Sequence, residues 1–256
     1  MRLTQAKIER IRRVNPDIWH LELGQVDESL FRVKPGQTLL ARIVDDEGET
    51  LSWDPYLREQ WWPLGMTGQK TLLVERAANP RYEPGQHISL IGPVGEPYRF
   101  GQRAKNILLL AYDTAPTPLT VMIPWLLRHS LNVTLVLLGR ARRYNTDHLS
   151  AEVEVIRGDD DGLGWPDQVM SFGWADQMFT VVSPDDELLR FGELRQLALE
   201  RKVAIPNHFI YGVFQPVTVC GTGACYSCAL RMSGSARPHL TCVDGPAFDL
   251  LDVRLD

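Results

Sequence analysis

The sequence lacks the features of several large classes of protein. Its 27 lysines and arginines are outnumbered by 32 aspartates and glutamates, whereas proteins that mainly bind nucleic acid carry a positive surplus for phosphate contacts. No apolar run approaches the roughly 20 residues needed to span a bilayer, and the longest one, at 119–127, ends at Arg128. The opening MRLTQAKIERIRR contains no apolar core of a signal peptide. We therefore expect a cytoplasmic protein without a transmembrane segment and without a nucleic-acid partner, and peripheral association stays open.

Cysteine is scarce and is confined to one place. The chain has four cysteines and none precedes position 220. They are Cys220, Cys225, Cys228 and Cys242. The spacing C-x4-C-x2-C, with a fourth cysteine after a longer gap, is the plant-type ferredoxin arrangement for a 2Fe-2S cluster. These four residues are the candidate metal ligands.

The residues between the cysteines suit such a cluster. The loop reads CGTGACYSC, and Gly221 and Gly223 lack a Cβ, so they can adopt positive φ angles. That backbone brings amide groups against the sulfur atoms, where hydrogen bonds help to set the reduction potential. The x2 gap favours Cys225 and Cys228 on one side of the site.

Three other interpretations of the cysteines are weaker. A structural zinc site usually has two C-x2-4-C pairs, whereas Cys242 stands alone. Disulfides are disfavoured because a chain without a secretion signal keeps its thiols reduced. A Rieske centre needs two histidine ligands, and His239 has no second histidine beside it. No G-x-S-x-G element marks a hydrolase serine, so hydrolytic chemistry has no candidate either.

The first hundred residues have the pattern of short strands and tight turns that is typical of a β-barrel. VKPGQTLLARIV (33–44) and YEPGQHISLIGPVG (82–95) each place a Pro-Gly turn before an apolar or alternating strand. AKIERIRRV, DIWHLEL and KTLLVER add further strand-like segments. Together they predict an antiparallel barrel or sandwich, and we expect the barrel.

After Arg103 the pattern changes to strands that alternate with helices. ILLLAYD (107–113) is typical of a buried strand, PLTVMIPWLLRH is helical, and NVTLVLLG is a second buried strand. Another strand at 176–183 precedes a helix at 185–201, whose acidic start suits the helix dipole. This order predicts βαβ units and a largely parallel sheet.

The predicted fold class is therefore a multidomain α+β and α/β chain. It comprises an N-terminal antiparallel β-barrel (1–102), a Rossmann-like α/β domain (103–204) and a small C-terminal 2Fe-2S cysteine-loop domain (205–256). The length of 256 residues agrees with more than one hydrophobic core.

Several motifs carry a resemblance to a known family. The loop CGTGACYSC and the CVDGPAF segment that begins at Cys242 are similar to a family cluster loop and its C-x-D-G-P-x-F tail. KPGQ at 34–37, GPVG at 92–95 and the IPWLL helix add architectural likeness. The chain thus resembles the electron-transfer subunit of dihydroorotate dehydrogenase, in the ferredoxin–NADP reductase superfamily. The resemblance implies FAD on the barrel, NAD(P)H on the α/β domain, a 2Fe-2S cluster at the end, and a partner enzyme.

The resemblance breaks down at the nicotinamide site. Such proteins have a glycine-rich loop after the first α/β strand, where phosphates approach backbone amides. Here the loop AYDTAPTPL (111–119) contains no glycine, and Asp113 adds a negative charge. The family's Cys-Gly-Pro motif corresponds to Val182-Ser183-Pro184. We expect the domain to serve as a scaffold that binds no NAD(P).

The flavin site implied by the resemblance is only partly kept. The family's Arg-Pro-x-Ser-like stretch corresponds to DPYLREQWWPLGM (54–66), where Trp62-Pro63-Leu64-Gly65 stands in place of arginine and serine. Three roles are open for Trp61 and Trp62: stacking on a flavin ring, filling the space of that ring, or facing a partner. Large aromatic residues near an apolar strand are most often core residues. The candidate FAD-binding residues are Tyr56, Arg58, Gly92, Pro93 and Gly95.

The favoured hypothesis is an electron-transfer subunit. A 2Fe-2S cluster would relay electrons to or from a partner oxidoreductase, with FAD left open, so the chain is an oxidoreductase component rather than a complete enzyme. Two alternatives remain. One is a self-sufficient NAD(P)H-dependent reductase with an unusual dinucleotide loop. The other is a non-catalytic assembly subunit in a larger complex, in which the metal site is structural.

Overall fold

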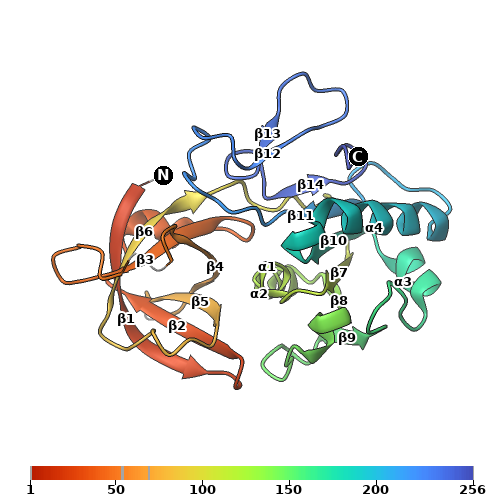
Figure 1. Cartoon of the computed structure of the whole chain (residues 1–256). Helices are drawn as coiled ribbons and strands as arrows, with labels where there is room; N and C mark the ends of the chain where they lie inside the picture. Colours follow the sequence, from red (N-terminus) through yellow and green to blue (C-terminus); the bar gives the residue numbers. More distant parts are fainter. Residues whose placement is uncertain (1, 53–54, 69, 256) are drawn as a thin grey trace. The chain divides into compact units, whose positions relative to one another are not determined.

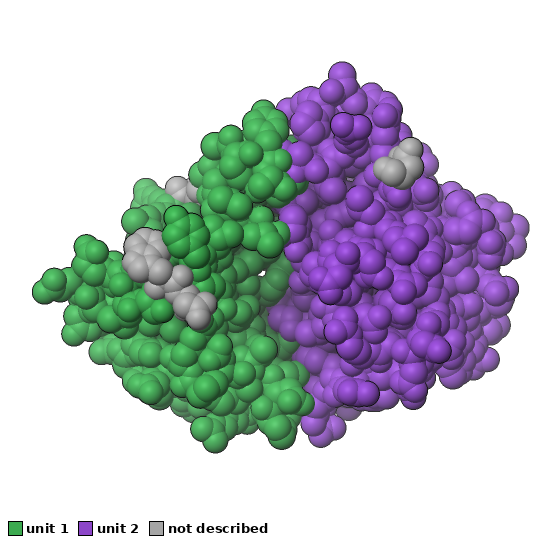
Figure 2. Space-filling view, in the orientation of Figure 1, with its two compact units in different colours: residues 1–98, 217–228, 242–244 green, residues 99–216, 229–241, 245–256 purple. Residues whose placement is uncertain are grey.

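The chain forms two compact units in the computed structural model. The structure describes residues 2–52, 55–68 and 70–255, so Asp54, the first residue of the stretch compared with flavin sites, lies outside the described residues. The first unit comprises residues 1–98, 217–228 and 242–244, and the second comprises 99–216, 229–241 and 245–256 (Figure 2). The two units are described separately below.

Six strands of the first unit close into an antiparallel barrel (Figure 1). Their order is β1-β2-β5-β4-β3-β6, and β1 pairs with both β2 and β6, which closes the sheet. The strands are β1 (Arg2–Arg13), β2 (Ile18–Gly24), β3 (Thr38–Val44), β4 (Glu59–Met66), β5 (Leu72–Ala77) and β6 (His87–Val94), and a helical turn η1 (Glu28–Arg32) follows β2. The predicted antiparallel barrel is confirmed.

Alternate side chains of these strands fill the barrel, as the two-residue period of a strand requires. Leu21 and Leu23 on β2 and Ile88 and Leu90 on β6 are fully buried in one cluster. Trp61 on β4 belongs to the same cluster, and its ring meets Tyr82 edge-on with 5.8 Å between centroids. Of the roles that the sequence left open for Trp61, core packing is the one observed.

The second unit is built on a six-stranded mixed sheet in the order β14-β11-β10-β7-β8-β9. The neighbours from β11 to β9 are parallel, and β14 is antiparallel to β11. The strands are β7 (Asn106–Tyr112), β8 (Asn132–Leu138), β9 (Val153–Arg157), β10 (Gln177–Val182), β11 (Ile210–Val213) and β14 (Ala247–Asp249). The Rossmann-like α/β arrangement is confirmed. Edge strand β14, which lies in the CVDGPAF segment and the residue after it, was not predicted.

Helices connect the strands of this sheet along the chain. They are α1 (Thr117–Thr120), α2 (Ile123–Arg128), α3 (Gln168–Trp174) and α4 (Glu187–Arg201), with short 3-10 helices η2 (Gly139–Arg143) and η3 (Pro184–Asp186). The link from β8 to β9 contains η2 rather than an α-helix, so it is not a full βαβ crossover. Among the described residues, no helix is long and apolar enough to cross a membrane.

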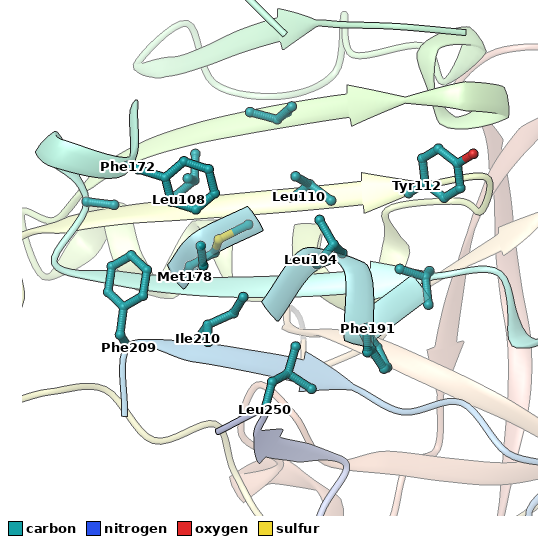
Figure 3. Close-up of a cluster of buried hydrophobic side chains, with 14 of the residues drawn as sticks. Leu108, Leu110, Tyr112, Phe172, Met178, Phe191, Leu194, Phe209, Ile210 and Leu250 are labelled. Carbon is teal, nitrogen blue, oxygen red and sulfur yellow. The ribbon is translucent and has the colours of Figure 1, made fainter. Parts of the chain in front are cut away.

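Helix α4 packs one stripe of side chains onto the sheet. Its buried residues Phe191, Leu194 and Ala198 recur at the spacing of a single helix face. Figure 3 shows Phe191 and Leu194 in one layer with Leu110 of β7 and Ile210 of β11. This shared apolar cluster is the main core of the second unit.

The C-terminal segment contributes to both units. Residues 217–228 and 242–244 belong to the barrel unit, while a hairpin of β12 (Ala229–Leu230) and β13 (His239–Leu240) belongs to the α/β unit. The predicted boundaries at 102 and 204 stay predictions.

Glu187, at the first position of α4, is a half-buried carboxyl group in the α/β unit. Its Oε1 accepts a hydrogen bond from the Gln215 amide at 2.8 Å. Burial raises the pKa of Glu187 to about 7, and the Gln215 hydrogen bond opposes that shift. The folded chain therefore holds a proton here at pH values where the unfolded chain has already lost it.

The Glu187→Gln variant should be less sensitive to pH than the wild type. A carboxyl group whose pKa is raised on folding stabilises the folded state at low pH, and this stabilisation is lost as pH rises from about 4.5 to about 7. Glutamine keeps the acceptor for Gln215 and has no charge to bury. Urea unfolding at pH 4.5 and pH 8 should show the variant gaining stability over the wild type only at pH 8. Exposed Glu200→Gln is the control, and an identical gain there would contradict the account.

Candidate metal centre

All four cysteines lie in the barrel unit. Cys228 and Cys242 are buried, each with 4% of its surface exposed, whereas Cys220 is half-buried and Cys225 is exposed. The site therefore has a buried side and an open side.

Two of the sulfur atoms lie in direct contact. Cys228 Sγ lies 3.4 Å from Cys242 Sγ. Cys225 Sγ lies 3.2 Å from the Ser227 hydroxyl, and hydrogen bonding to Cys225 is one of the causes that lower the pKa of Cys220. The sequence spacing favoured Cys225 and Cys228 together and did not indicate the partnership of Cys228 with Cys242. The sequence does not show this contact, because residues 229–241 separate Cys228 from Cys242 along the chain.

The backbone between the cysteines has the conformation expected of a cluster loop. Gly221 and Gly223 have φ angles of 69° and 79°, a region that suits glycine because other residues are strained there. The Thr222 amide, which lies between the two glycines, donates to Cys220 Sγ at 3.4 Å. The prediction that these glycines adopt positive φ is confirmed, and the loop directs one amide at a sulfur.

The two sides of the site favour different protonation states for free thiols. Hydrogen bonds from Thr222 lower the pKa of Cys220 to about 5. Burial raises the pKa of Cys242 to about 12, and its hydrogen bond with Cys228 adds to the rise. Four thiolates crowded here repel one another, so a cationic metal is the natural counter-charge for the fully deprotonated set.

Hydrogen bonds tie the fourth cysteine to the barrel. The Gly95 amide donates to the Cys242 carbonyl at 3.1 Å, and the Gln37 side-chain amide donates to the Gly95 carbonyl at 3.2 Å. Gly95 was a candidate flavin residue in the GPVG turn, and Gln37 belongs to the KPGQ turn. Both motifs hold the cysteine segment, a role that sequence reasoning missed.

Four exposed apolar residues lie close in sequence to the cysteines. Val217, Val219, Tyr226 and Val243 are exposed by 68%, 47%, 60% and 43% respectively. We call these four residues the loop patch. They lie on the two segments that carry the cysteines, and contiguous exposed apolar side chains are typical of a contact surface.

The candidate flavin residues have structural partners in the barrel. Arg58 donates to both the backbone carbonyl and the hydroxyl of Ser89, at 2.8 and 3.0 Å, and burial lowers its pKa. Tyr56 is 73% exposed, and its carbonyl accepts a hydrogen bond from Arg42. Gly92 is packed so tightly that an added Cβ would lie 2.4 Å from Leu39 Cδ2. Pro93 follows it in β6.

A carboxylate is paired with two arginines next to a cavity of the barrel unit. Glu59 forms ion pairs with Arg76 at 3.2 Å and Arg81 at 2.6 Å, and it accepts a hydrogen bond from Tyr82. A cavity of about 260 Å³ beside Glu59 is lined by Arg42, Leu57 and Arg81 among others. The single carboxylate balances one of the two positive charges that it contacts.

The loop after β7 is closed by its own side chain. Asp113 has a φ of 56°, and its Oδ1 accepts a hydrogen bond from the Arg140 amide at 2.8 Å. Gly139 approaches so closely that an added Cβ would lie 2.1 Å from Asp113 Oδ1. The Asp113 carboxylate therefore accepts the hydrogen bond of the Arg140 amide, and that amide is not available to an anionic ligand at this edge of the sheet.

Comparison with known proteins agrees with these features. Residues 216–254 match the family described as the iron-sulfur cluster binding domain of dihydroorotate dehydrogenase B. The electron transfer subunit of dihydroorotate dehydrogenase B (NAD(+)) from Desulforamulus reducens is 25% identical over 262 aligned positions, which cover 95% of each chain. The subunit of the same name from Bacillus caldolyticus is 26% identical over 87% of each chain.

Solved structures share the fold. An NADH-dependent reduced ferredoxin-NADP oxidoreductase aligns with a TM-score of 0.71 at 19% identity, covering 98% of this chain and 90% of that one. Phthalate dioxygenase reductase aligns with a TM-score of 0.54 at 15% identity, covering 87% of this chain and 70% of that one. The chain is thus similar along nearly its whole length to an electron transfer subunit of dihydroorotate dehydrogenase B, and its residues 216–254 match the iron-sulfur cluster binding domain family of that enzyme.

Proposed function

We propose that the chain relays single electrons through a 2Fe-2S cluster to or from a partner oxidoreductase. The observation that carries the proposal is the placement of all four cysteines in one unit, with the sulfurs of Cys228 and Cys242 3.4 Å apart and the Thr222 amide directed at Cys220. A 2Fe-2S cluster needs two thiolates on each of two irons, and the four cysteines can supply them. When bound, the cluster supplies one-electron redox chemistry without making or breaking a substrate bond.

The contact between Cys228 and Cys242 assigns ligands to the two irons. Two thiolates bound at about 2.3 Å to one tetrahedral metal ion lie roughly 3.8 Å apart, and the sulfurs of Cys228 and Cys242 are 3.4 Å apart. Cys228 and Cys242 would hold the buried iron, and Cys220 with Cys225 would hold the outer one. The Thr222 amide, which donates to Cys220 Sγ, would stabilise negative charge on that sulfur.

Electrons would pass at the open side of the site. Cys225 is exposed and its neighbour Tyr226 is 60% exposed, so a partner's cofactor can approach there. The loop patch supports docking of that partner, because burial of its apolar side chains stabilises a complex. Relatives named as electron transfer subunits agree with a working partner that is a catalytic subunit.

No step is assigned to a flavin or to a nicotinamide. Arg58 donates a hydrogen bond to Ser89, and Glu59 forms an ion pair with Arg81. Asp113 accepts a hydrogen bond from the Arg140 amide. The proposal therefore favours a component over a self-sufficient reductase. Four cysteines kept as metal-binding thiolates also agree with a reducing compartment, and we place the chain in the cytoplasm on that ground.

Replacing Cys228 by serine should remove the cluster. Cys228 is buried beside Cys242, and loss of one ligand of the inner iron leaves that iron with a single protein thiolate. The anaerobically purified wild type should contain about two irons and two labile sulfides per chain, and the variant should contain almost none. Ser227→Ala, which alters the same loop without removing a thiol, should keep both. One zinc per wild-type chain without sulfide would overturn the ligand assignment and favour a structural metal.

The loop patch should matter for partner binding and not for the cluster. Val219→Asp or Tyr226→Asp places a charge in an apolar contact, and each should lower recovery of a co-purifying oxidoreductase at least tenfold, about 1.4 kcal/mol. Iron content should stay at the wild-type value. Leu3→Asp is the control, because Leu3 is 68% exposed on β1. Equal recovery for all of these variants would mean that the patch does not bind the partner.

The isolated chain should not oxidise NADH or NADPH. Electrostatic repulsion from Asp113, together with its hold on the Arg140 amide, opposes binding of a pyrophosphate. Anaerobic incubation with either nucleotide and a dye acceptor should give no reduction above the buffer rate, while dithionite should reduce the cluster. Robust dye reduction by NADH would support the alternative of a self-sufficient reductase.

A further inference from the structure

A concave site with no cysteine in its lining lies in the α/β unit, where the hairpin between Cys228 and Cys242 meets the C-terminal segment. A cavity of about 530 Å³ opens between the β12–β13 hairpin and the C-terminal segment. We call it the arginine pocket. It is lined by Ala229, Arg231, Met232, Ser235, Ala236, Arg237, Pro238 and Arg254. Its volume is within the range of about 300–1,000 Å³ that is typical of small-molecule sites.

Two short segments pair to form one wall of this pocket. Met232 and Val253 form an antiparallel bridge. The Arg254 amide donates to the Arg231 carbonyl at 2.9 Å, and the Ser233 amide donates to the Asp252 carbonyl at 2.6 Å. In this register Arg231 and Arg254 are directly opposite each other. Side chains at opposite positions of an antiparallel pair project from the same face, with Cα atoms about 5.5 Å apart.

The C-terminal strand of the wall is held from outside the pocket. Arg195 of α4 donates to the carbonyls of Leu250 and Val253, at 3.4 and 3.2 Å. Arg195 thereby fixes the backbone that carries Arg254, and the guanidinium of Arg254 remains available to the pocket. The two opposed arginines are therefore set on an anchored backbone.

Opposed arginines are costly unless an anion lies between them. Like charges directly opposite in an antiparallel pair destabilise it. Among the residues that the structure describes, no carboxylate lies within ion-pair distance of Arg231 or Arg254. General basicity does not explain the pair, since the chain has a net charge of −5. The arrangement calls for a negative charge supplied by a ligand.

We propose that the arginine pocket binds a small organic anion with two or more negative charges, carried by phosphate or carboxylate groups. Guanidinium groups bind both of these planar or tetrahedral oxyanions through paired, charge-assisted hydrogen bonds. Arg237 adds a third guanidinium to the lining, and Met232 and Pro238 offer apolar contact to the carbon skeleton of the ligand. This proposal is independent of the cluster, since no cysteine lines the pocket.

Calorimetric titration of the full chain tests the proposal with two probes, pyrophosphate and citrate, in phosphate-free buffer at low salt. At least one probe should bind saturably at one site per chain. Tighter binding of pyrophosphate identifies phosphate as the preferred group, and tighter binding of citrate identifies carboxylate. Arg231→Gln and Arg254→Gln should each weaken that binding by about tenfold or more, whereas exposed Arg201→Gln on α4 should leave it unchanged.

Thermal unfolding provides a readout that a loss of folding would not imitate. Without anion, Arg254→Gln should unfold at the wild-type temperature or above it, because it removes the repulsion with Arg231. The bound probe should raise the unfolding temperature of the wild type and not that of the variant. No saturable binding of either probe, or equal weakening by Arg201→Gln, would overturn the proposal. Binding of an acidic peptide in place of both small anions would overturn it as well and would identify a protein-docking surface.

Discussion

The close approach of Cys228 and Cys242 is the contact on which the functional site depends. Their sulfurs lie 3.4 Å apart although the hairpin of 229–241 separates them in the chain. The hairpin begins directly after Cys228, and its register pairs Ala229 with Leu240, so its two strands return the chain to the same place. The Gly95 amide then fixes the Cys242 carbonyl to the barrel. Backbone pairing therefore brings two of the four cysteines together.

The four cysteines differ in their surroundings. Cys228 and Cys242 are buried and in contact with each other. The outer pair differs, because Cys220 and Cys225 are held mainly by the loop's own amides and lie nearer to solvent. A rigid inner pair with a more open outer pair suits a relay, since the cluster stays in place while one edge meets a partner.

The core of the α/β unit does not depend on the loop after β7. The parallel sheet persists because its core, centred on Phe191, Leu194 and the strands beneath them, folds the unit. At its edge Asp113 bonds to the Arg140 amide. A domain can thus keep its packing after its ligand chemistry has changed, because packing depends on the buried face of the sheet and ligand binding depends on a few loop residues.

Local signals in the sequence were sufficient for the barrel, the α/β sheet and the cysteine loop. Strand periodicity and Pro-Gly turns are properties of neighbouring residues, and the positive φ angles of Gly221 and Gly223 follow from a spacing within nine residues. Features formed by distant segments could not be predicted in this way. The antiparallel β14, the pairing of Cys228 with Cys242, the bond from Gly95 to Cys242 and the opposition of Arg231 to Arg254 all depend on register between remote segments.

Electron paramagnetic resonance of the reduced protein tests the central claim most directly. The anaerobic wild-type chain, reduced with dithionite and frozen, should give a signal that integrates to about one unpaired electron per chain, since a 2Fe-2S cluster accepts one electron. Mixing it with its oxidised partner before freezing should remove the signal as the partner is reduced. A chain that gives no signal after reduction, or a signal that persists unchanged beside a competent partner, would contradict the electron relay.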